Sequence, residues 1–280
     1  MKIAVASGKG GTGKTSVASS LFLARPGTLG IDLDVEEPNM GILLGSPEME
    51  VRPVHLPVAV IDGDICTGCG LCARECAYGA LAWFGSGKPV VNDTLCRGCG
   101  LCPLICPVKA IGEENREVGD VTAGTVEGAP FIEGRLRVGS INSVHVIEAA
   151  VKEASAFENP DWVMDCAPGA ACPVAAALRA ADLALLVTEP TPFGLSDLEG
   201  LLQLTSEMGI PAALVINKTG MGDASFDDIC ERYGVEILAR YPFSRALAES
   251  GARGESPYRA DASWARTTDS LWETLERRLS

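Results

Sequence analysis

Eight of the eleven cysteines in this sequence fall into two runs with the same spacing, Cys-x-x-Cys-x-x-Cys-x-x-x-Cys. The runs are Cys66, Cys69, Cys72, Cys76 and Cys96, Cys99, Cys102, Cys106. Thiolates at these offsets can hold three corners of a 4Fe-4S cubane, and the longer last spacer lets the fourth thiolate bind a second cluster. Cys-x-x-Cys pairs can also form zinc sites, and a cluster can be a purely structural staple. The order of all eight favours iron-sulfur chemistry, with electron transfer as the default role.

A second set of residues forms a glycine-rich loop, Gly8-Lys9-Gly10-Gly11-Thr12-Gly13-Lys14-Thr15. The loop follows an apolar run at residues 2–7 and precedes a helix-compatible stretch at 16–24. In such a loop backbone N–H groups surround phosphates, Lys14 meets the β/γ charge and Thr15 binds magnesium. The glycines also match a dinucleotide fingerprint, with Asp32 where a ribose-binding acid is expected. The Lys14-Thr15 pair decides for a triphosphate.

The apolar pattern predicts an α/β fold with a mostly parallel sheet. Apolar runs that end in Asp, Pro, Gly or Asn occur at residues 28–33, 162–164, 183–188 and 212–216. Buried parallel strands deliver loops to a site in this way. Between residues 57 and 114 the sequence becomes Gly-rich and Cys-rich, which predicts an inserted small α+β domain. We therefore expect a discontinuous nucleotide-binding domain at 1–56 and 115–280, and the insert at 57–114.

Lys9 is a second lysine in the loop, and with it the chain resembles the MinD, Mrp and nitrogenase iron protein ATPases, whose P-loop reads Lys-Gly-Gly-x-Gly-Lys-Ser/Thr. The resemblance implies a homodimer with ATP at the interface, in which Lys9 reaches the partner's nucleotide and Lys14 its own. A solvated loop lysine is the alternative for Lys9. The nucleotide-binding residues expected on this basis are Gly8, Gly10, Gly11, Thr12, Gly13, Lys14, Thr15, Ser16, Gly169 and Asn217.

Two acidic segments resemble the switch regions of the same ATPases. Asp32-Leu33-Asp34 resembles switch I, which implies that Asp34 orients the attacking water and Asp32 supports the magnesium ion. Asp165-Cys166-Ala167-Pro168-Gly169 resembles switch II, which places Asp165 near magnesium, directly or through a water, and Gly169 near the γ-phosphate. Each acid by itself could instead cap a helix.

The segment Asn217-Lys218-Thr219-Gly220 begins like the guanine-reading box Asn-Lys-x-Asp but has Gly220 where the guanine-pairing carboxylate is needed. Adenine is therefore favoured. The Asn217 amide can hydrogen-bond an adenine edge, and Tyr241 and Phe243 either pack against the base or are ordinary packing residues.

The cysteine-rich block resembles bacterial two-cluster ferredoxins. Residues 65–81 and 95–111 align as an internal repeat, so we expect pseudo-twofold symmetry. The resemblance implies one 4Fe-4S cluster on Cys66, Cys69, Cys72 and Cys106, and the other on Cys96, Cys99, Cys102 and Cys76. Pro107 follows Cys106 as in that family, but Ala77 replaces the proline after Cys76. A proline there supplies no ligand, so only local packing or potential is affected.

Three cysteines lie outside these runs. Cys172 follows Asp165 by seven residues, much as the nitrogenase iron protein has a cluster-binding cysteine just beyond its switch. Cys172, alone or with Cys166, is either a further metal ligand near the dimer axis or a packing residue, because free cysteine is often buried. Cys230 is expected in the core.

Composition narrows the partners. A formal charge of −14 argues against nucleic acid, and ligand-spaced cysteines imply a reducing cytoplasm. Arg179 and Asp182 interrupt the longest apolar stretch, at 170–187, so no stable membrane insertion is expected. A last helical pattern should dock on the sheet, not a membrane, because its polar face is acidic; its apolar residues are Trp264, Leu271, Trp272, Leu275 and Leu279.

Together these features predict an ATPase that couples ATP-driven dimer switching to electron transfer toward a metalloprotein or a metal-cluster assembly partner. One alternative is an ATP-dependent carrier of an iron-sulfur or heterometal cluster. A second is a redox-sensing ATPase with a positioning or regulatory role.

Overall fold

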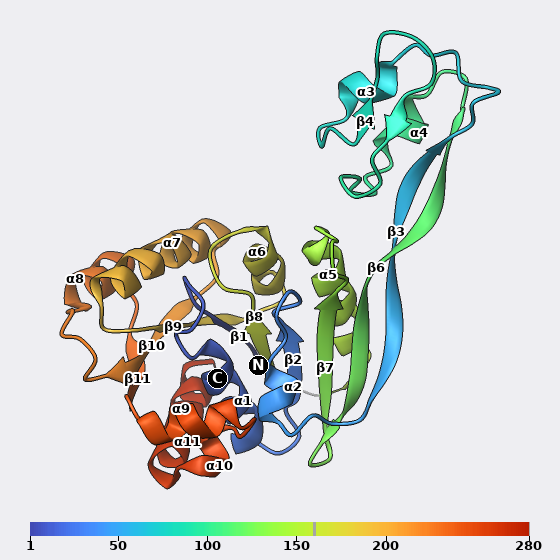
Figure 1. The fold of residues 1–280 in the computed structure, drawn as a ribbon. Helices are drawn as coiled ribbons and strands as arrows, with labels where there is room; N and C mark the ends of the chain where they lie inside the picture. The colour runs from blue at the N-terminus through green and yellow to red at the C-terminus, as the bar shows by residue number, and fades with distance from the viewer. Residues whose placement is uncertain (159–160, 280) are drawn as a thin grey trace. The chain divides into compact units, whose positions relative to one another are not determined.

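The computed structural model describes residues 1–158 and 161–279. Its main sheet has the strand order β11-β10-β9-β1-β8-β2-β7-β6-β3, and β4 and β5 form a separate antiparallel pair (Figure 1). The strands are β1 (Lys2–Ala6), β2 (Leu29–Leu33), β3 (Met49–Ile61), β4 (Leu81–Ala82), β5 (Val90–Val91), β6 (Ile111–Val126), β7 (Ala129–Leu136), β8 (Trp162–Cys166), β9 (Leu183–Thr188), β10 (Ala212–Thr219) and β11 (Ile237–Pro242).

The centre of the sheet is parallel, as the sequence predicts. In β1, Ile3 lies opposite Val163 of β8 and Leu183 of β9. In β2, Asp32 lies opposite Asp165 of β8. Parallel strands place their carboxyl ends at one edge, so Asp32 and Asp165 meet there beside the glycine loop.

Eleven helices complete the described part of the chain: α1 (Lys14–Ala24), α2 (Met40–Leu43), α3 (Leu71–Glu75), α4 (Leu101–Ile105), α5 (Ser143–Ala154), α6 (Cys172–Leu178), α7 (Pro192–Met208), α8 (Asp227–Tyr233), α9 (Arg245–Ala252), α10 (Pro257–Ala260) and α11 (Ala262–Leu279). The structure confirms that the last helix docks on the core. The Trp272 indole N–H donates to the Leu21 carbonyl oxygen at 2.7 Å, and Trp264 stacks on Tyr241 at 4.0 Å. No described helix is long and apolar enough to cross a bilayer.

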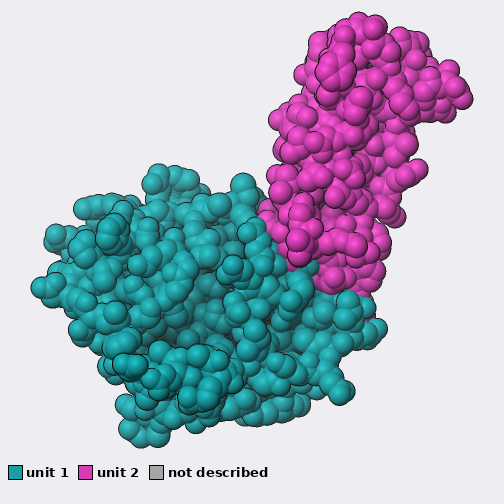
Figure 2. Space-filling view, in the orientation of Figure 1, with its two compact units in different colours: residues 1–51, 121–135, 147–280 teal, residues 52–120, 136–146 magenta. Residues whose placement is uncertain are grey.

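The chain divides into two compact units (Figure 2). Unit 1 comprises residues 1–51, 121–135 and 147–280, of which 159–160 and 280 are outside the described ranges. It contains the glycine loop and a large core, in which β8, β9 and all of β1 except Lys2 are buried. Unit 2 comprises residues 52–120 and 136–146. It contains both cysteine runs, and its bounds reach past 57–114 because the long strands β3 and β6 extend beyond the cysteine-rich block.

Candidate functional site

The glycine loop connects β1 to α1 in a conformation that needs glycine. Gly11 and Gly13 have φ values of 80° and 91°, which L-side chains rarely adopt. A Cβ on Gly13 would lie 2.1 Å from Asn217 Nδ2, and one on Gly8 would lie 2.3 Å from the carbonyl oxygen of Asp197. The loop therefore packs against β10 and α7 at positions where any side chain would clash.

Lys14, the first residue of α1, is buried between two carboxylates from strand ends. Its Nζ lies 2.7 Å from Asp165 Oδ1 and 3.3 Å from Asp34 Oδ2. Burial by itself would lower the pKa of Lys14, but the attraction of Asp165 and Asp34 outweighs it and raises the pKa above its usual range. Lys14 is thus charged, and a phosphate in the loop would compete with these carboxylates for it.

Asp32 is fully buried and engaged by backbone donors. Its Oδ1 accepts from the Asp34 N–H at 3.0 Å, and its Oδ2 accepts from the Asn39 and Met40 N–H groups at 3.0 and 2.9 Å. Burial, and then repulsion by Asp165, raise the pKa of Asp32. These bonds fix the loop that carries Asp34, so support of a magnesium ion by Asp32 would be indirect.

Oxygen atoms suited to magnesium are present at the same edge. Asp165 Oδ2 is buried and has no hydrogen-bond partner among the described residues. Thr15 follows Lys14 as the second residue of α1, and it is half-buried. Because Mg²⁺ prefers hard oxygen ligands, an orphaned carboxylate oxygen and a loop hydroxyl fit this ion. Burial raises the pKa of Asp34, against the pull of Lys14, which suits a group that handles a water proton.

Lys9 is held by an acid that follows β9. Its Nζ lies 3.2 Å from Glu189 Oε2, while Lys218 Nζ lies 2.6 Å from Glu189 Oε1. Lys218 also donates to the Gly11 carbonyl oxygen at 2.5 Å. Burial would raise the pKa of Glu189, but the hydrogen bonds from Lys218 and Lys9 outweigh it and lower the pKa. Glu189 therefore links both lysines to the glycine loop as a carboxylate.

Asn217 holds the loop from the neighbouring strand end. Its Nδ2 donates to the Thr12 carbonyl oxygen at 2.7 Å, and its Oδ1 accepts from the Lys218 N–H at 2.8 Å. The bond to Thr12 uses one of the two Nδ2 protons. A cavity of about 270 Å³ adjoins this amide and the loop. It is lined by Gly11, Gly13, Ser16, Asn217, Lys218, Phe243, Leu247 and Trp264, among others.

The aromatic residues near this cavity have different roles. Tyr241 is fully buried and its hydroxyl lies 3.0 Å from Thr268 Oγ1, so it is a packing residue. Burial raises its pKa to about 12. Phe243 is half-exposed and lines the cavity. The structure therefore separates the two aromatic residues, with Tyr241 in the core and Phe243 beside the cavity.

The segment after β8 is closed onto the glycine loop. Gly169 has a φ of 94°, and its N–H donates to the Ser7 carbonyl oxygen at 2.8 Å. Cys166 is fully buried in β8, and burial raises its pKa despite the nearby Lys14. Cys172 is exposed at the start of α6. The structure thus separates the two thiols, with Cys172 the accessible one.

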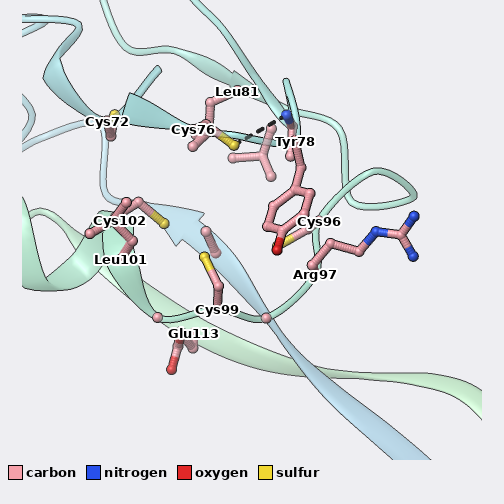
Figure 3. A pocket seen from close by; sticks show the side chains of 15 residues that line it. Cys72, Cys76, Tyr78, Leu81, Cys96, Arg97, Cys99, Leu101, Cys102 and Glu113 are labelled. Carbon is pink, nitrogen blue, oxygen red and sulfur yellow. Dashed lines mark hydrogen bonds between the residues drawn. The ribbon is translucent and has the colours of Figure 1, made fainter. Parts of the chain in front are cut away.

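In unit 2 the cysteines surround two cavities. One is lined by Cys66, Cys69, Cys72 and Cys106, with Gly70, Leu71 and Pro107. The other is lined by Cys76, Cys96, Cys99 and Cys102, together with Cys72 at its edge. Figure 3 shows the thiols of this second set directed around a common space, with Cys72 farther off. Each cavity thus takes three cysteines from one run and the last cysteine of the other.

The two halves of unit 2 have matching local structure. α3 and α4 both follow a left-handed glycine, Gly70 or Gly100, with φ values of 70° and 72°. Backbone N–H groups point at the last cysteine of each run: Ala80 N lies 3.4 Å from Cys76 Sγ, and Ala110 N lies 3.2 Å from Cys106 Sγ. Such N–H···S contacts stabilise thiolates. The local geometry is consistent with the expected pseudo-twofold relation.

All eleven cysteines are free, and the thiols of the two sets differ. Burial, and then repulsion by Cys96, raise the pKa of Cys102 to about 11. Hydrogen bonds from the Leu71 N–H and the Thr67 hydroxyl, against some desolvation, lower the pKa of Cys69. Within residues 1–158 and 161–279, no three Cys, His, Asp or Glu side chains converge on the position of one metal ion. The thiols of each set instead lie around a space, which fits a group with several metal atoms better than a single ion.

With this geometry in place, the chain can be compared with known proteins. A family model described as the CobQ/CobB/MinD/ParA nucleotide binding domain matches residues 3–258. The chain belongs to this family. It is therefore a P-loop nucleotide-binding protein of the MinD/ParA class of ATPases.

Relatives include two uncharacterized proteins of Methanocaldococcus jannaschii. One is 33% identical over 231 residues, 81% of each chain, and the other 29% identical over 261 residues, 91% of each chain. A ferredoxin of Pyrobaculum islandicum is 38% identical over 64 residues, which are 23% of this chain and 60% of that protein.

Two similar solved structures are MinD proteins. The cell division ATPase MinD of Pyrococcus furiosus has a TM-score of 0.59 and 19% identity, with 99% of this chain and 98% of that chain covered. MinD of Pyrococcus horikoshii, in a complex with Mg-ADP, has a TM-score of 0.59 and 18% identity, with 98% and 95% covered. At these identities the likeness establishes the fold.

Sequence reasoning missed Glu189, Arg74 and Arg97. Glu189 directly follows β9, as Asp34 and Asp165 lie at the ends of β2 and β8, so its position was the available signal. Arg74 donates to the Cys69 carbonyl oxygen at 3.1 Å, and Arg97 donates to Asn142 Oδ1 at 3.0 Å. The only sequence signal for either arginine was its position between two cysteines of a run.

Proposed function

We propose that this protein binds and hydrolyses Mg-ATP in a homodimer, and that it couples this cycle to electron transfer through two 4Fe-4S clusters held by unit 2. The observation that carries the proposal is the crossed arrangement of the eight thiols, which line two cavities in a chain that also has a complete glycine loop. The match to a ferredoxin over 64 residues supports the second half of the proposal.

In the ATP site each residue has a role that follows from its contacts. The N–H groups of Gly8 to Ser16 surround the phosphates, and Lys14 exchanges its carboxylate partners for phosphate oxygens. Thr15 and Asp165 hold magnesium, the latter through its free Oδ2 or a water. Asp34 is released from Lys14 in this exchange and orients the attacking water.

Lys9 is the residue that connects the two subunits. In this structure Glu189 holds it beside its own loop. A cation that crosses to the phosphates of the partner subunit would stabilise charge that develops in hydrolysis. Lys9 therefore contacts the partner's phosphates only when the dimer is closed. Because this contact needs a bound nucleotide, closure depends on the nucleotide.

In unit 2 the first set, Cys66, Cys69, Cys72 and Cys106, would hold one cluster, and the second set, Cys96, Cys99, Cys102 and Cys76, the other. Bound clusters supply one-electron storage. The chain itself supplies the thiolates, the N–H groups of Ala80 and Ala110 that point at sulfur, and the enclosing apolar residues Ile61, Leu81 and Ile111. The receiving partner would be a metalloprotein or a metal-cluster assembly protein.

One observation favours a second candidate, a cluster carrier. Cys172 is exposed at the start of α6, three residues after Gly169, so a thiol is accessible beside the nucleotide-sensing segment. A labile cluster held there, across the dimer axis, could be released when ATP closes or opens the subunits.

The test is anaerobic reconstitution, followed by an iron count per chain and an EPR-monitored potential titration with and without ATP. Eight irons per chain and an ATP-dependent shift of a potential support gated electron transfer. Iron above eight that ATP makes available to a chelator, and that Cys172→Ala removes, supports the carrier instead. A preparation that binds ATP but holds one zinc per cysteine run contradicts both.

A further inference from the structure

The internal repeat of unit 2 pairs every residue near one cysteine set with a counterpart near the other. Cys66 corresponds to Cys96, and the same offset pairs Arg74 with Leu104 and Trp83 with Glu113. Because α3 and α4 have equal length and the same glycine cap, Arg74 and Leu104 occupy equivalent places in their halves. Trp83 follows the short strand β4 and Glu113 lies within the long strand β6, so this second pair is equivalent in sequence. Differences within a pair are therefore differences between the two sites.

At the first set a cation lies against the cysteine loop. Arg74 Nη1 donates to the Cys69 carbonyl oxygen at 3.1 Å, and its guanidinium lies 5.9 Å from the centre of the Trp83 ring. The indole in turn covers Gly70, where a Cβ would lie 2.5 Å from the ring. The positive charge is thus fixed beside the loop that carries Cys66, Cys69 and Cys72.

At the second set both equivalent positions are more negative. Leu104, in the place of Arg74, is uncharged and 82% exposed. Glu113, in the place of Trp83 in the repeat, lines the second cavity with Cys99 and Cys102, and Figure 3 shows its carboxylate directed away from the thiols. Compared with the first set, the second set thus has the uncharged Leu104 in place of a cation and the carboxylate of Glu113 in place of an indole.

The second loop does contain an arginine, Arg97, at the position of Thr67. Its guanidinium donates to Asn142 Oδ1 at 3.0 Å and to the Ile141 carbonyl oxygen. Arg97 lines the second cavity, but Figure 3 shows its guanidinium directed away from the space that the thiols surround. The guanidinium of Arg97 is therefore hydrogen-bonded to residues 141–142, whereas that of Arg74 is hydrogen-bonded to the cysteine loop itself.

Fixed charges beside a cluster change its reduction potential, because a nearby cation stabilises the form with the additional electron and an anion opposes it. The second shell of a metal group acts in the same way through hydrogen bonds. Arg74 and Glu113 act in the same sense here, since one favours reduction at the first set and the other disfavours it at the second.

We propose that the two sites are unequal, and that the first set, Cys66, Cys69, Cys72 and Cys106, has the higher reduction potential, with Arg74 as the positioning residue that sets the difference. An electron from a one-electron donor of low potential, such as a reduced viologen, would then rest at the first set. This inference rests on the proposed function, since it requires clusters at both sets.

The test is a matched exchange in the reconstituted full-length protein, with both potentials measured by EPR-monitored titration. Arg74→Leu should lower the higher potential and leave the lower one in place. Leu104→Arg should raise the lower potential, because by the repeat its guanidinium reaches the Cys99 carbonyl oxygen. In the double variant the two shifts should appear together and narrow or reverse the gap. Iron content is counted in each variant, so that a lost cluster is not read as a shift.

Arg137→Leu is the control. Arg137 pairs with Glu117 at 2.7 Å in unit 2, so its loss changes the net charge equally without touching a cysteine loop. It should leave both potentials unchanged. Eight irons with two equal potentials, or a shift of the lower potential in Arg74→Leu, would overturn the inference and leave the proposed function standing. A preparation without clusters would remove the proposed function instead.

Discussion

Lys9 Nζ lies 3.2 Å from Glu189 Oε2 within one subunit. The same carboxylate binds Lys218, which in turn holds the Gly11 carbonyl oxygen, so one acid connects the lysine to the loop that surrounds the phosphates. In the proposed dimer, Lys9 would have to leave this pair to reach a partner's nucleotide. Closure would then exchange one anion, Glu189, for another, the triphosphate.

The two loop lysines should separate binding from turnover. Lys14→Ala should abolish nucleotide binding, because it removes the one buried cation of the phosphate site. Lys9→Ala should leave ATP affinity within about 3-fold but reduce hydrolysis by about 100-fold, the usual effect of losing one group that stabilises developing charge. Binding is measured with a fluorescent ATP analogue, and circular dichroism controls for folding. Equal loss of binding in both variants would contradict the shared interface.

Asp34→Ala should bind ATP and fail to turn it over, with kcat lower by about 100-fold, as expected for loss of a residue that orients the attacking water. Asp32→Asn is the matched control, because Asp32 is occupied by three backbone N–H donors. Its main effect should be a lower melting temperature. Normal hydrolysis by Asp34→Ala would show that another group orients the water.

Gly13→Ala should destabilise unit 1 by about 1–3 kcal/mol, because it combines a left-handed backbone with a steric clash. The new methyl group would lie 2.1 Å from Asn217 Nδ2. Gly10→Ala is the control, since a Cβ there meets nothing within 4 Å. Thermal unfolding of both variants without nucleotide tests this. An unchanged melting temperature in Gly13→Ala would mean that the loop can move away from β10.

Phe193 should be an anchor of the ATP-dependent dimer. It is 78% exposed in α7, four residues after Glu189. Phe193→Asp should weaken dimerisation with ATP by about 10-fold or more, as the loss of an aromatic interface residue does, and should not change monomer stability. Analytical ultracentrifugation with a hydrolysis-deficient Asp34→Ala background measures it. Met221→Asp is the control, because Met221 is also exposed and the charge change is the same.

Removal of the clusters should unfold unit 2 and spare unit 1. The small core of unit 2 consists of Ala59, Ile61, Cys72, Leu81 and Ile111, with four further cysteines packed against it. So small a core would depend on the proposed clusters for stability. After chelation, amides of residues 62–111 should exchange at least about 10-fold faster, while those of β1, β8 and β9 keep their protection. Unchanged exchange in unit 2 would contradict a folding role for the clusters.

Local signals were enough to predict the strands that flank the glycine loop and the docked last helix, because their apolar periodicity is strong. The length of β6 was not predictable, since its first half carries polar residues such as Glu113, Glu114 and Arg116 without an apolar repeat. The ion pairs of Glu189 and the two hydrogen bonds of Asn217 depend on which strand ends become neighbours in the sheet. No short stretch of sequence specifies that order.

The backbone of unit 2 is interlocked across its repeat. The Asp62 N–H donates to the Ala110 carbonyl oxygen, and the equivalent Asn92 N–H donates to the Ala80 carbonyl oxygen. Each half is therefore hydrogen-bonded to the backbone of the other, and its last cysteine lines the cavity of the other. A single half would find these backbone and cysteine partners only in a second copy of itself. In the duplicated chain the two halves are covalently linked, so they need not associate by diffusion. Loss of either half removes both cavities at once, which makes this unit one cooperative element and not two independent ones.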